Sequence, residues 1–422
     1  MRKLRLFEKI FSIVNKPSYK QITLFGLPVY KKFFATEEEK TFYAKLPVVK
    51  NKIVFMNYWG KSYGCNPKYI LEEIRHRKLP YELVWAINGY PDDFEVDFPQ
   101  GIRFVQYKSK EFIKELASAK IWISNHHFAK QFALGLIKKP EQFFIQTWHG
   151  SLGIKKIEKN VKTLTDEQDW EHFACESSKA TDIWVSNSKF ESQIYEQAFW
   201  DVKGIKELGH PRNDIFFKSA EEKNNIRKKV LQALSIPEDK KVLLYAPTFK
   251  DTTSLSSYNI EFSKLLPVLK EKFGGDWVVV SRMHPSFRKR HYNKIKELKN
   301  TYNANNYPDI QELLVSADIA ITDYSSCIFD FMLSKKPAFI YAANISDYEI
   351  ERGFYYPLSS TPFPIAENNN QLIENITHFD YKEYKEKIEI FLKEKDCMED
   401  GHASERVVDI IEKIMSGNYE RN

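Results

Sequence analysis

Short apolar runs alternate with longer polar stretches of helical spacing along most of the chain. The runs are rich in β-branched and aromatic residues and begin at about Lys52. The first series reads KIVFMN, ELVWAIN, IRFVQY, KIWISN, FFIQTWHG and IWVSNS, and a second series reads KVLLYAPTF, WVVVSRMHP, DIAITDYSS and PAFIYAA. Such alternation predicts parallel sheets covered by helices, an α/β fold.

A charged segment of helical spacing, EEKNNIRKKVLQAL, separates the two series and follows GHPRNDIFF. We therefore predict two doubly wound, Rossmann-type domains that face a cleft, with the boundary near Phe217. The first domain takes residues 46–217 and the second takes residues 218–380. The tail, residues 381–422, is rich in Lys and Glu and predicts closing helices. One of these helices is expected to cross back to the first domain.

Residues 1–45 form a basic extension ahead of the first domain. Helical spacing at its start places Leu4, Phe7, Phe11 and Val14 on one face, with arginine and lysine side chains around it. This pattern predicts an amphipathic helix, which serves either as an anchor in a lipid interface or as a helix packed on the protein's own core. No stretch approaches the roughly 20 apolar residues of a membrane-spanning helix, and no signal peptide is recognisable. We expect a protein that stays inside the cell.

The composition supports a globular, two-domain protein. A chain of 422 residues is too long for one hydrophobic core, and its 43% apolar and 28% charged residues are ordinary values. The net charge of +6 favours anionic partners such as nucleotides, phosphate polymers or acidic lipid headgroups, but it is too small for a dedicated nucleic-acid binder. The four cysteines are widely scattered, which indicates reduced thiols.

In open α/β sheets, ligands bind beyond the carboxyl ends of the strands, and one such end carries two serines. In ITDYSSCIFDFMLSKKP a strand is expected to end at Thr322 and a helix to begin near Cys327. Ser325 and Ser326 then lie at the helix N-terminus, where free N–H groups and the helix dipole attract phosphate. The alternative is an ordinary helix cap without a ligand.

Two further strand ends carry histidine followed by proline. In SRMHPS, His284 is able to donate a hydrogen bond to a phosphate oxygen, and Arg282 offers a fixed positive charge. A histidine that serves only the structure is the alternative. GHPRND repeats the pattern in the first half, where Arg212 either contacts phosphate or pairs with Asp214 at the hinge.

QTWHGSLGIKK is the most suggestive stretch of the first half. His149 follows a buried-looking strand, and Gly150 gives the backbone room to turn or to approach a ligand. Lys155 and Lys156 add positive charge. An imidazole at this position is expected to titrate near neutrality and to take a proton from an attacking hydroxyl. The alternative is a core histidine that hydrogen-bonds a neighbouring carbonyl.

Several other chemistries lack their motifs. The chain has no GxxxxGK[ST] loop and no GxGxxG after the first strand, which disfavours ATPase and dinucleotide-binding functions. It has no Asp-x-Asp triplet of the kind that holds a nucleotide-bound cation in many glycosyltransferases. His126 and His127 are adjacent at a strand end and are expected to point to opposite faces, so they form no metal pair. We predict a reaction without metal or cofactor.

In chain order, WHGSLGIKK, GHPRND, YAPTFKD, SRMHP, TDYSSCIFDF and KKPAFIYAANISDYEIERGFYY resemble the motifs of the CDP-glycerol glycerophosphotransferase family, the polymerases and primases of teichoic acid and capsule synthesis. The resemblance extends from about Lys52 to Pro357. It implies a GT-B-like fold, with an acceptor side in the first domain and a CDP-polyol donor in the second. It further implies peripheral attachment to the inner face of the cell membrane, and it identifies His149 and His284 as the two histidines on which activity depends.

Two departures from the family pattern concern the acceptor side. Ser151 and Leu152 stand where the family commonly has Thr-Pro after WHG, and Cys65 stands where an acidic residue often precedes Asn-Pro. These changes leave open a capsule or modified-glycan acceptor in place of a standard teichoic acid chain.

The predicted function is transfer of a polyol phosphate, with glycerol phosphate as the first choice, from CDP-glycerol or CDP-ribitol to a hydroxyl of a lipid-linked polymer, with release of CMP. His149 is the expected general base, and His284, Ser325 and Ser326 are expected to hold the diphosphate. Further candidates for phosphate contact are Arg212, Thr248, Arg282, Asp323 and Arg352. No nucleic-acid partner is expected, and the sequence is compatible with an oligomer.

Two other functions fit parts of the pattern. A sugar-nucleotide glycosyltransferase of the same fold would use similar diphosphate contacts but break a bond at an anomeric carbon. A catalytically silent scaffold for polymer assembly would bind the donor without turning it over.

Overall fold

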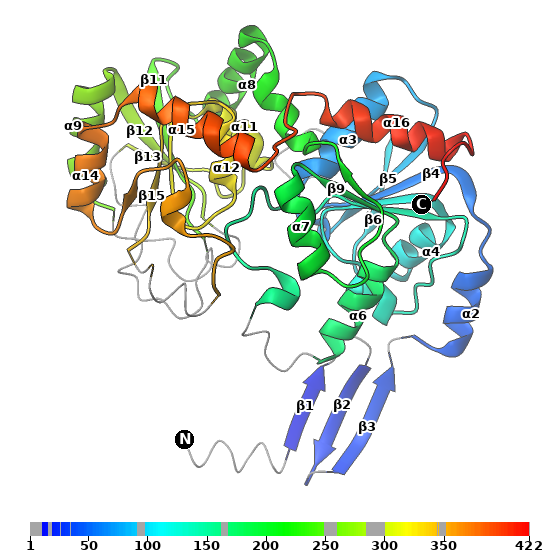
Figure 1. Ribbon diagram of the computed structural model, residues 1–422. Helices are drawn as coiled ribbons and strands as arrows, with labels where there is room; N and C mark the ends of the chain where they lie inside the picture. The colour runs from blue at the N-terminus through cyan, green and yellow to red at the C-terminus, as the bar shows by residue number, and fades with distance from the viewer. Residues whose placement is uncertain are drawn as a thin grey trace.

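The computed structural model contains two large parallel sheets that lie side by side, and a small antiparallel sheet stands apart from them (Figure 1). The residues that the structure describes are 11–15, 19–25, 27–33, 35–90, 98–161, 168–248, 260–283, 300–343, 345 and 352–421. Helices pack around each of the large sheets. The predicted α/β architecture with two parallel sheets is confirmed.

The first large sheet has seven parallel strands in the order β10-β9-β8-β7-β4-β5-β6. The strands are β4 (Val49–Met56), β5 (Glu82–Ile87), β6 (Ile102–Gln106), β7 (Ala119–Ser124), β8 (Phe143–Gln146), β9 (Ile183–Ser186) and β10 (Ile205–Glu207). The helices of this half are α2 (Glu37–Lys45), α3 (Cys65–His76), α4 (Lys110–Ser118), α5 (Ala129–Ala133), α6 (Gln168–Lys179) and α7 (Lys189–Ala198). The central strands form because continuous apolar runs such as IVFM are buried on both faces.

The second large sheet has six parallel strands in the order β13-β12-β11-β14-β15-β16. They are β11 (Lys240–Tyr245), β12 (Asp276–Ser281), β13 (Thr301–Asn303), β14 (Ile319–Thr322), β15 (Ala338–Tyr341) and β16 (Ile365–Ala366). The helices of this half are α8 (Ala220–Ala233), α9 (Phe262–Phe273), α11 (Ile310–Ser316), α12 (Cys327–Met332) and α14 (Asn369–Thr377). The strand end at Thr322 and the helix start at Cys327 are where the sequence predicted them.

Both sheets reverse their strand order at one point. In the first sheet the reversal lies between β4 and β7, and in the second it lies between β11 and β14. This switch point is the place where ligands bind in doubly wound sheets, because the loops leaving the two central strands diverge there. The residues that follow these four strands therefore define the region in which to build a site.

The N-terminal segment differs from its prediction. Residues Phe11–Asn15 form strand β1 and not part of a helix, so the predicted helical face is wrong for Phe11 and Val14. β1 pairs with β2 (Tyr19–Leu24), which pairs with β3 (Leu27–Phe33), both antiparallel. Periodicity alone does not separate a short apolar strand from a helix, and here pairing with a second strand decides the conformation. Residues 1–10 lie outside the described residues.

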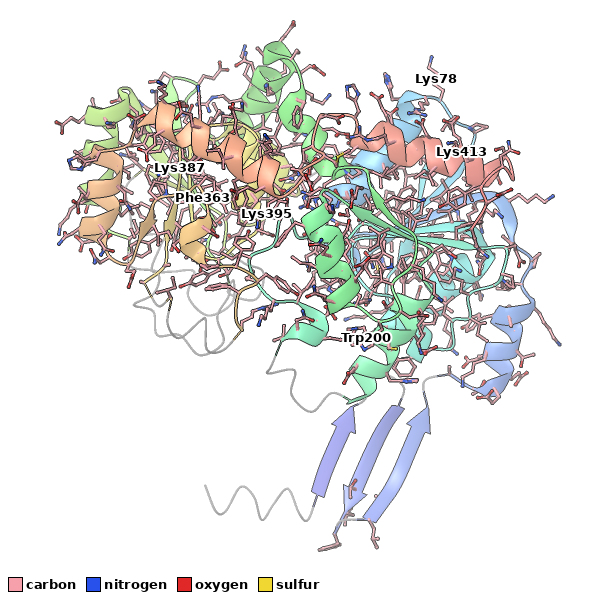
Figure 2. The ribbon with its side chains drawn as sticks, in the orientation of Figure 1. Lys78, Trp200, Phe363, Lys387, Lys395 and Lys413 are labelled. Carbon is pink, nitrogen blue, oxygen red and sulfur yellow. The ribbon has the colours of Figure 1, made fainter. Side chains whose placement is uncertain are left out.

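The chain end contributes one helix to each half. α15 (Tyr381–Glu394) buries Ile388 and Phe391 in the core of the second half, whereas α16 (Ala403–Met415) buries Val408 and Ile411 against the first sheet. Lys395, at the end of α15, joins the halves (Figure 2). Its ammonium lies 4.0 Å from the ring centroid of Phe190 in the first half and 4.2 Å from that of Tyr356 in the second.

Candidate active site

The switch point of the first sheet is held by two asparagines, one after each central strand. Asn125, after β7, donates from Nδ2 to Oδ1 of Asn57 at 2.7 Å and accepts the backbone N–H of Tyr58 at 2.9 Å. The short 3-10 turn Tyr58–Gly60 follows β4. Gly60 has φ 77°, and a Cβ there would lie 2.8 Å from the carbonyl carbon of Ile87, so only glycine fits. The turn is thereby fixed against the sheet.

His149 lies beside this turn, three residues after β8. Its Nδ1 lies 2.8 Å from the backbone oxygen of Asn125. A carbonyl oxygen only accepts, so Nδ1 carries the proton and Nε2 keeps its lone pair. The hydrogen bond to a carbonyl that a purely structural histidine would make is therefore present. The same hydrogen bond selects the tautomer that a general base acting through Nε2 requires.

A cluster of rings surrounds His149. Its ring stacks on that of His126, with centroids 5.4 Å apart and planes 13° apart. Tyr58 meets His149 edge-on at 5.3 Å, and Trp148 lies 4.3 Å away. Nδ1 of His126 accepts the backbone N–H of His127 at 2.9 Å. The cluster makes His149 a half-buried residue with little freedom to rotate.

Burial lowers the pKa of His149 to about 4, and the hydrogen bond to Asn125 offsets only part of this effect. The pKa of His126 is lowered well below its usual value, first by burial and then by the charge of His149. The expected titration of His149 near neutrality is therefore wrong for the unliganded protein. The imidazole is neutral at physiological pH, which is the protonation state that a general base needs.

The switch point of the second sheet is polar and contains no ring stack of this kind among the residues the structure describes. Thr248, which follows β11, donates its hydroxyl to Asp323 at 2.8 Å and its backbone N–H to the same carboxylate at 2.9 Å. Asp323, which follows β14, also accepts the N–H of Tyr324 at 2.6 Å. Two of the predicted phosphate contacts are thus brought together, with the carboxylate fixing the threonine.

Ser325 and Ser326 lie between Asp323 and α12, as predicted. Ser326 occupies the N-cap position, but its side chain makes no capping hydrogen bond, and its backbone is helical with φ −65° and ψ −13°. An ordinary cap therefore does not explain this serine. Burial raises the pKa of the Cys327 thiol to about 11, and the neighbouring Ser325 offsets only part of this effect.

The three arginines proposed as phosphate contacts have protein partners. Arg282 donates from Nη1 to the carbonyl oxygens of Ala304, Asn305 and Tyr307, at 2.6, 2.7 and 2.5 Å. Arg352 is exposed and donates from Nε to the carbonyl of Lys156 at 3.3 Å. Arg282 thus stabilises the loop after β13, whereas Arg352 lies beside the His149 loop.

Arg212 is only 3% exposed, and each of its guanidinium nitrogens is bonded within the protein. Nε and Nη2 contact Asp330 at 3.0 and 3.2 Å, Nη2 donates to the carbonyl of Gly150 at 2.6 Å, and Nη1 lies 3.8 Å from the thiol of Cys65. The alternative pairing with Asp214 is wrong, because Asp214 accepts the N–H groups of Ala403 and Ser404. Arg212 therefore joins the loop of His149 to helix α12.

A further connection between the halves is a short ladder of backbone hydrogen bonds. Tyr355 donates its N–H to the carbonyl of Ile154 at 2.8 Å, and Lys156 donates to the carbonyl of Gly353 at 3.1 Å. Lys155 and Phe354 form the antiparallel bridge between them. The WHGSLGIKK and RGFYY motifs are thus adjacent in space, although about 200 residues separate them in sequence.

Sequence reasoning missed the residues that hold this arrangement. Asn57 and Asn125 lie in none of the family motifs, and only their position after central strands could have suggested them. Asp330 belongs to the motif TDYSSCIFDF, but its role as the partner of Arg212 was not predicted. His284 lies outside the described residues, so its predicted role stays a prediction. In the described part of the chain, no group of three or more His, Cys, Asp or Glu side chains is arranged to hold a metal ion; the metal-free reaction also stays a prediction.

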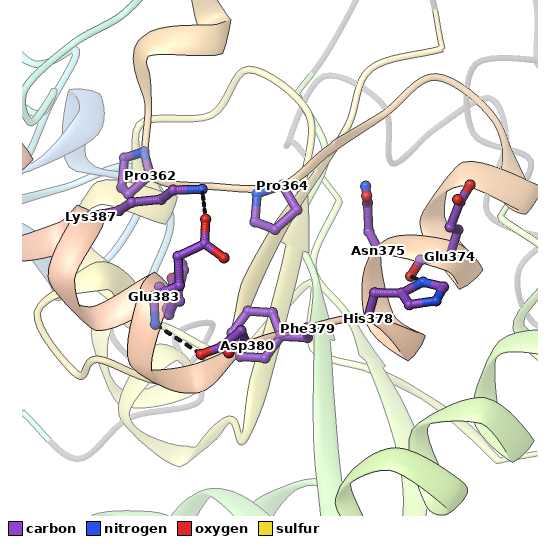
Figure 3. A pocket seen from close by; sticks show the side chains of 10 residues that line it. Pro362, Pro364, Glu374, Asn375, His378, Phe379, Asp380, Glu383 and Lys387 are labelled. Carbon is purple, nitrogen blue, oxygen red and sulfur yellow. Dashed lines mark hydrogen bonds and ion pairs between the residues drawn. The ribbon is translucent and has the colours of Figure 1, made fainter.

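A pocket lies elsewhere, in the second half (Figure 3). Its walls include Pro362, Pro364, His378, Phe379 and Lys387 from the segment around α14 and α15. It contains no predicted site residue.

The fold and the two switch points define a two-sheet α/β protein of the GT-B type. The chain shares this fold with UDP-GlcNAc 2-epimerase from Neisseria meningitidis, a structure solved with UDP-GlcNAc, at a TM-score of 0.51 and 14% identity over 86% of this chain and 100% of that one. A likeness at that identity shows the fold alone.

The chain belongs to the CDP-glycerol:poly(glycerophosphate) glycerophosphotransferase family, which matches residues 39–413. It is 32% identical to the teichoic acid glycerol-phosphate transferase of Staphylococcus aureus, over 88% of this chain and 95% of that protein. It is 30% identical to the teichoic acid poly(glycerol phosphate) polymerase of Bacillus spizizenii, over 86% of this chain and 92% of that protein. The family predicted from the motifs is confirmed, and the chain is a transferase of this family.

Other relatives are longer or have solved structures. The chain spans half the length of the Staphylococcus epidermidis poly(glycerol phosphate) polymerase, to which it is 32% identical over 86% of its own residues. The structure of the wall teichoic acid polymerase TagF is similar at a TM-score of 0.75 and 30% identity, covering 91% of this chain and 94% of that one. A TagF variant soaked with CDPG gives a TM-score of 0.76 at 29% identity, over 91% of this chain and 94% of that one.

Proposed function

We propose that this protein transfers glycerol phosphate from CDP-glycerol to a hydroxyl of a lipid-linked teichoic acid or capsule-type polymer and releases CMP. The proposed reaction rests on one observation about His149. The carbonyl of Asn125 keeps the proton of the neutral imidazole on Nδ1, so Nε2 has a lone pair that can accept a proton. Glycerol is favoured over ribitol because the glycerol-phosphate relatives named above are 30 to 32% identical, whereas ribitol-phosphate primases and polymerases are 26 to 29% identical.

The proposed reaction is a direct displacement at phosphorus. The acceptor hydroxyl loses its proton to Nε2 of His149 while its oxygen bonds to the phosphorus that carries glycerol. The bond between that phosphorus and the CMP oxygen breaks, and CMP leaves with the electron pair. Holding the two substrates in line supplies a large part of the rate, and His149 adds proton transfer in the transition state.

The second half is proposed to hold the donor diphosphate. Ser325 and Ser326 offer hydroxyls at a strand end next to the switch point, and Thr248 is fixed there by Asp323. His284 follows the neighbouring strand β12 in the sequence and belongs to the same proposal. Arg352, also in the second half, brings an exposed positive charge next to the His149 loop, where it would offset the growing charge on CMP.

The donor experiment separates this function from its rivals. Purified protein is incubated with CDP-glycerol, CDP-ribitol or UDP-GlcNAc and a lipid-linked acceptor, and the released nucleotide is measured. Release of CMP from CDP-glycerol, together with a lengthened acceptor, supports the proposal. UDP release would show a glycosyltransferase, and donor binding without any nucleotide release would show a silent scaffold.

We propose that the protein works at the inner face of the cell membrane, and the antiparallel sheet β1–β3 supports this. No helix among the described residues is long and apolar enough to cross a membrane. The turn from β2 to β3 projects away from the body (Figure 1), and Phe25 and Leu27 at this turn are 72% and 69% exposed. Exposed apolar side chains gathered at one tip suit the boundary between headgroups and acyl chains.

Point variants test this contact better than a deletion, because removing the first 15 residues would remove strand β1 from its sheet. Replacing both Phe25 and Leu27 by Ser should weaken binding to phosphatidylglycerol-containing vesicles in a sedimentation assay. Phe42→Ser is the matched control, since Phe42 on α2 is also exposed but lies outside the tip. Equal vesicle binding by the double variant and the control would remove the tip from the proposal.

A further inference from the structure

The backbone of the turn after β4 is strained. Tyr58 and Trp59 both lie in the left-handed region, with φ 43° and 58°. Two consecutive bulky residues in this region cost free energy, and such strain persists only where the surroundings enforce it. Asn57, Asn125 and Gly60 enforce it here through the contacts described above. Strain of this kind gathers at ligand sites, so the turn is a candidate for substrate contact.

The strained turn places a line of groups between solvent and the proposed base. Lys61 is exposed, and its ammonium lies 4.9 Å from the ring centroid of Trp59. The ring of Trp59 lies 3.9 Å from that of His126, and His126 stacks on His149. The exposed ammonium of Lys61 and the half-buried indole of Trp59 are therefore in contact with the ring cluster around His149.

We propose that Trp59 and Lys61 form the subsite for the growing end of the acceptor, a short chain of polyol phosphates. The inference rests on the proposed function and names the substrate of the same site. The indole face suits the carbon chain of a polyol, and the ammonium suits the phosphodiester that precedes the attacking hydroxyl. The acceptor hydroxyl then reaches His149 from the side of the first sheet.

The two halves would thereby hold different anions. The groups proposed for the donor diphosphate follow strands of the second sheet, whereas Lys61 follows the first strand of the first sheet. A polymer of phosphodiesters carries one negative charge in every unit, so a cation near the base selects a charged chain end over a neutral one. Ser151 and Leu152, which depart from the family pattern, lie in the neighbouring His149 loop and do not supply this charge.

Steady-state kinetics with two acceptors test the subsite. A synthetic glycerol-phosphate trimer carries phosphodiesters, and free glycerol carries none. Lys61→Ala should raise KM for the trimer about tenfold, as expected for one lost charge-assisted contact, with kcat and the KM for CDP-glycerol near their original values. KM for free glycerol should not change. The rise should shrink at high salt, because exposed charges are screened.

Three variants complete the test. Lys61→Arg should keep most of the affinity for the trimer, and Trp59→Leu should raise KM for both acceptors, because stacking does not depend on charge. Lys413→Ala is the control, since Lys413 is an exposed lysine on α16 outside the subsite (Figure 2). An unchanged KM for the trimer in Lys61→Ala overturns the subsite and leaves the proposed transferase intact.

Failure of the proposed function gives a different result. If the original protein releases no CMP with any acceptor, titration calorimetry with the trimer alone still reports the subsite. Trimer binding that weakens about tenfold in Lys61→Ala but not in Lys413→Ala supports the subsite even then. Absence of trimer binding by the original protein overturns it.

Discussion

The two switch points share one topology and differ in chemistry. Each sheet reverses its order beside its first strand, at β4/β7 and at β11/β14. The first switch point is filled by imidazole and indole rings around His149, which are stacked and poorly solvated. The second is filled by a hydroxyl and a carboxylate, Thr248 and Asp323, with two serines next to them. The same backbone arrangement thus supports two different environments.

The difference fits the roles that we propose for the two halves. A low-polarity cluster keeps an imidazole neutral, which suits a group that must accept a proton. A polar strand end offers hydrogen bonds, which suits a group that must hold phosphate oxygens. Arg212 couples the two environments, because it bonds both the carbonyl of Gly150 and the carboxylate of Asp330. The strand order therefore determines where a site can form in each half, and the side chains at that point determine its chemistry.

The largest expected effect is the loss of His149. His149→Ala should lower kcat by roughly 10²-fold or more and leave donor affinity little changed, because a general base acts mainly in the transition state. Stopped assays of CMP release and donor calorimetry separate the two quantities. His378→Ala is the matched control, since His378 also bonds a backbone carbonyl through Nδ1, at 3.0 Å, but lies in the remote pocket of Figure 3.

The pH profile sharpens the same assignment. His149 must be unprotonated to act, and its pKa is lowered to about 4, so the rate should rise with pH through about 4 and stay level towards neutrality. This limb should be absent from the residual activity of His149→Ala. A limb near pH 7 that survives in the variant would assign the base to another residue and leave His149 as a structural part of its turn.

The next effect concerns the coupling between the two regions. Arg212→Ala leaves Asp330 buried without its cation, which should lower the free energy of unfolding by about 3–5 kcal/mol. Arg406→Ala, which breaks the more exposed pair with Asp400, should cost about 1 kcal/mol or less. Urea denaturation measures both. Arg212→Lys keeps the charge and should fold, so its donor affinity shows whether Arg212 contacts phosphate directly. A large loss of that affinity at near-normal stability would restore the phosphate role.

A smaller effect is expected at the second switch point. Replacing Ser325 and Ser326 by Ala should weaken CDP-glycerol binding about tenfold with little loss of stability, because Ser326 makes no capping bond. Ser219→Ala is the control. Ser219 caps α8 in a full capping box, so its loss should cost about 1 kcal/mol of stability and no donor affinity. Unchanged donor affinity in the serine double variant would place the phosphates elsewhere.

The last expected effect concerns only stability and its pH dependence, at the carboxyl of Glu399. Glu399 accepts from Asn187 at 3.1 Å and Asn213 at 2.7 Å, and burial raises its pKa to about 7. Because the folded state holds this proton more tightly than the unfolded state, the stability it contributes is full below about pH 4.5 and is lost as pH rises through 7. The melting temperature should therefore fall between pH 5 and pH 8, and less so in Glu399→Gln. Parallel curves for both proteins would contradict the assignment.

The sequence predicts most of the strands and helices of this protein, because the signals for them are local. Buried parallel strands need continuous apolar runs, and helices need spaced apolar positions, so the ten apolar runs and the charged segment of α8 are readable along the chain. The strand end at Thr322 and the start of α12 could be predicted for the same reason. Short edge strands such as β13 and β16 were missed, because two or three residues carry no period.

Where local signals were ambiguous, tertiary pairing decided. Residues Phe11–Asn15 fit a helical face as well as a strand, and hydrogen bonds to β2 make them a strand. Arg212 was equally able to contact phosphate or to pair with Asp214, and burial next to Asp330, 118 residues away, gives it a third role. Long-range partners of this kind leave no spacing in the sequence.

The sequence by itself determined the family, the two α/β halves and the residue types available at the strand ends. Only the tertiary structure decided which of these residues meet: that His149 has its tautomer fixed by Asn125, that the RGFYY segment pairs with the His149 loop, and that Trp59 and Lys61 continue the ring cluster to the surface. The physical reason is that protonation state, burial and ring stacking depend on neighbours brought together by folding, and the order of residues along the chain does not record those neighbours.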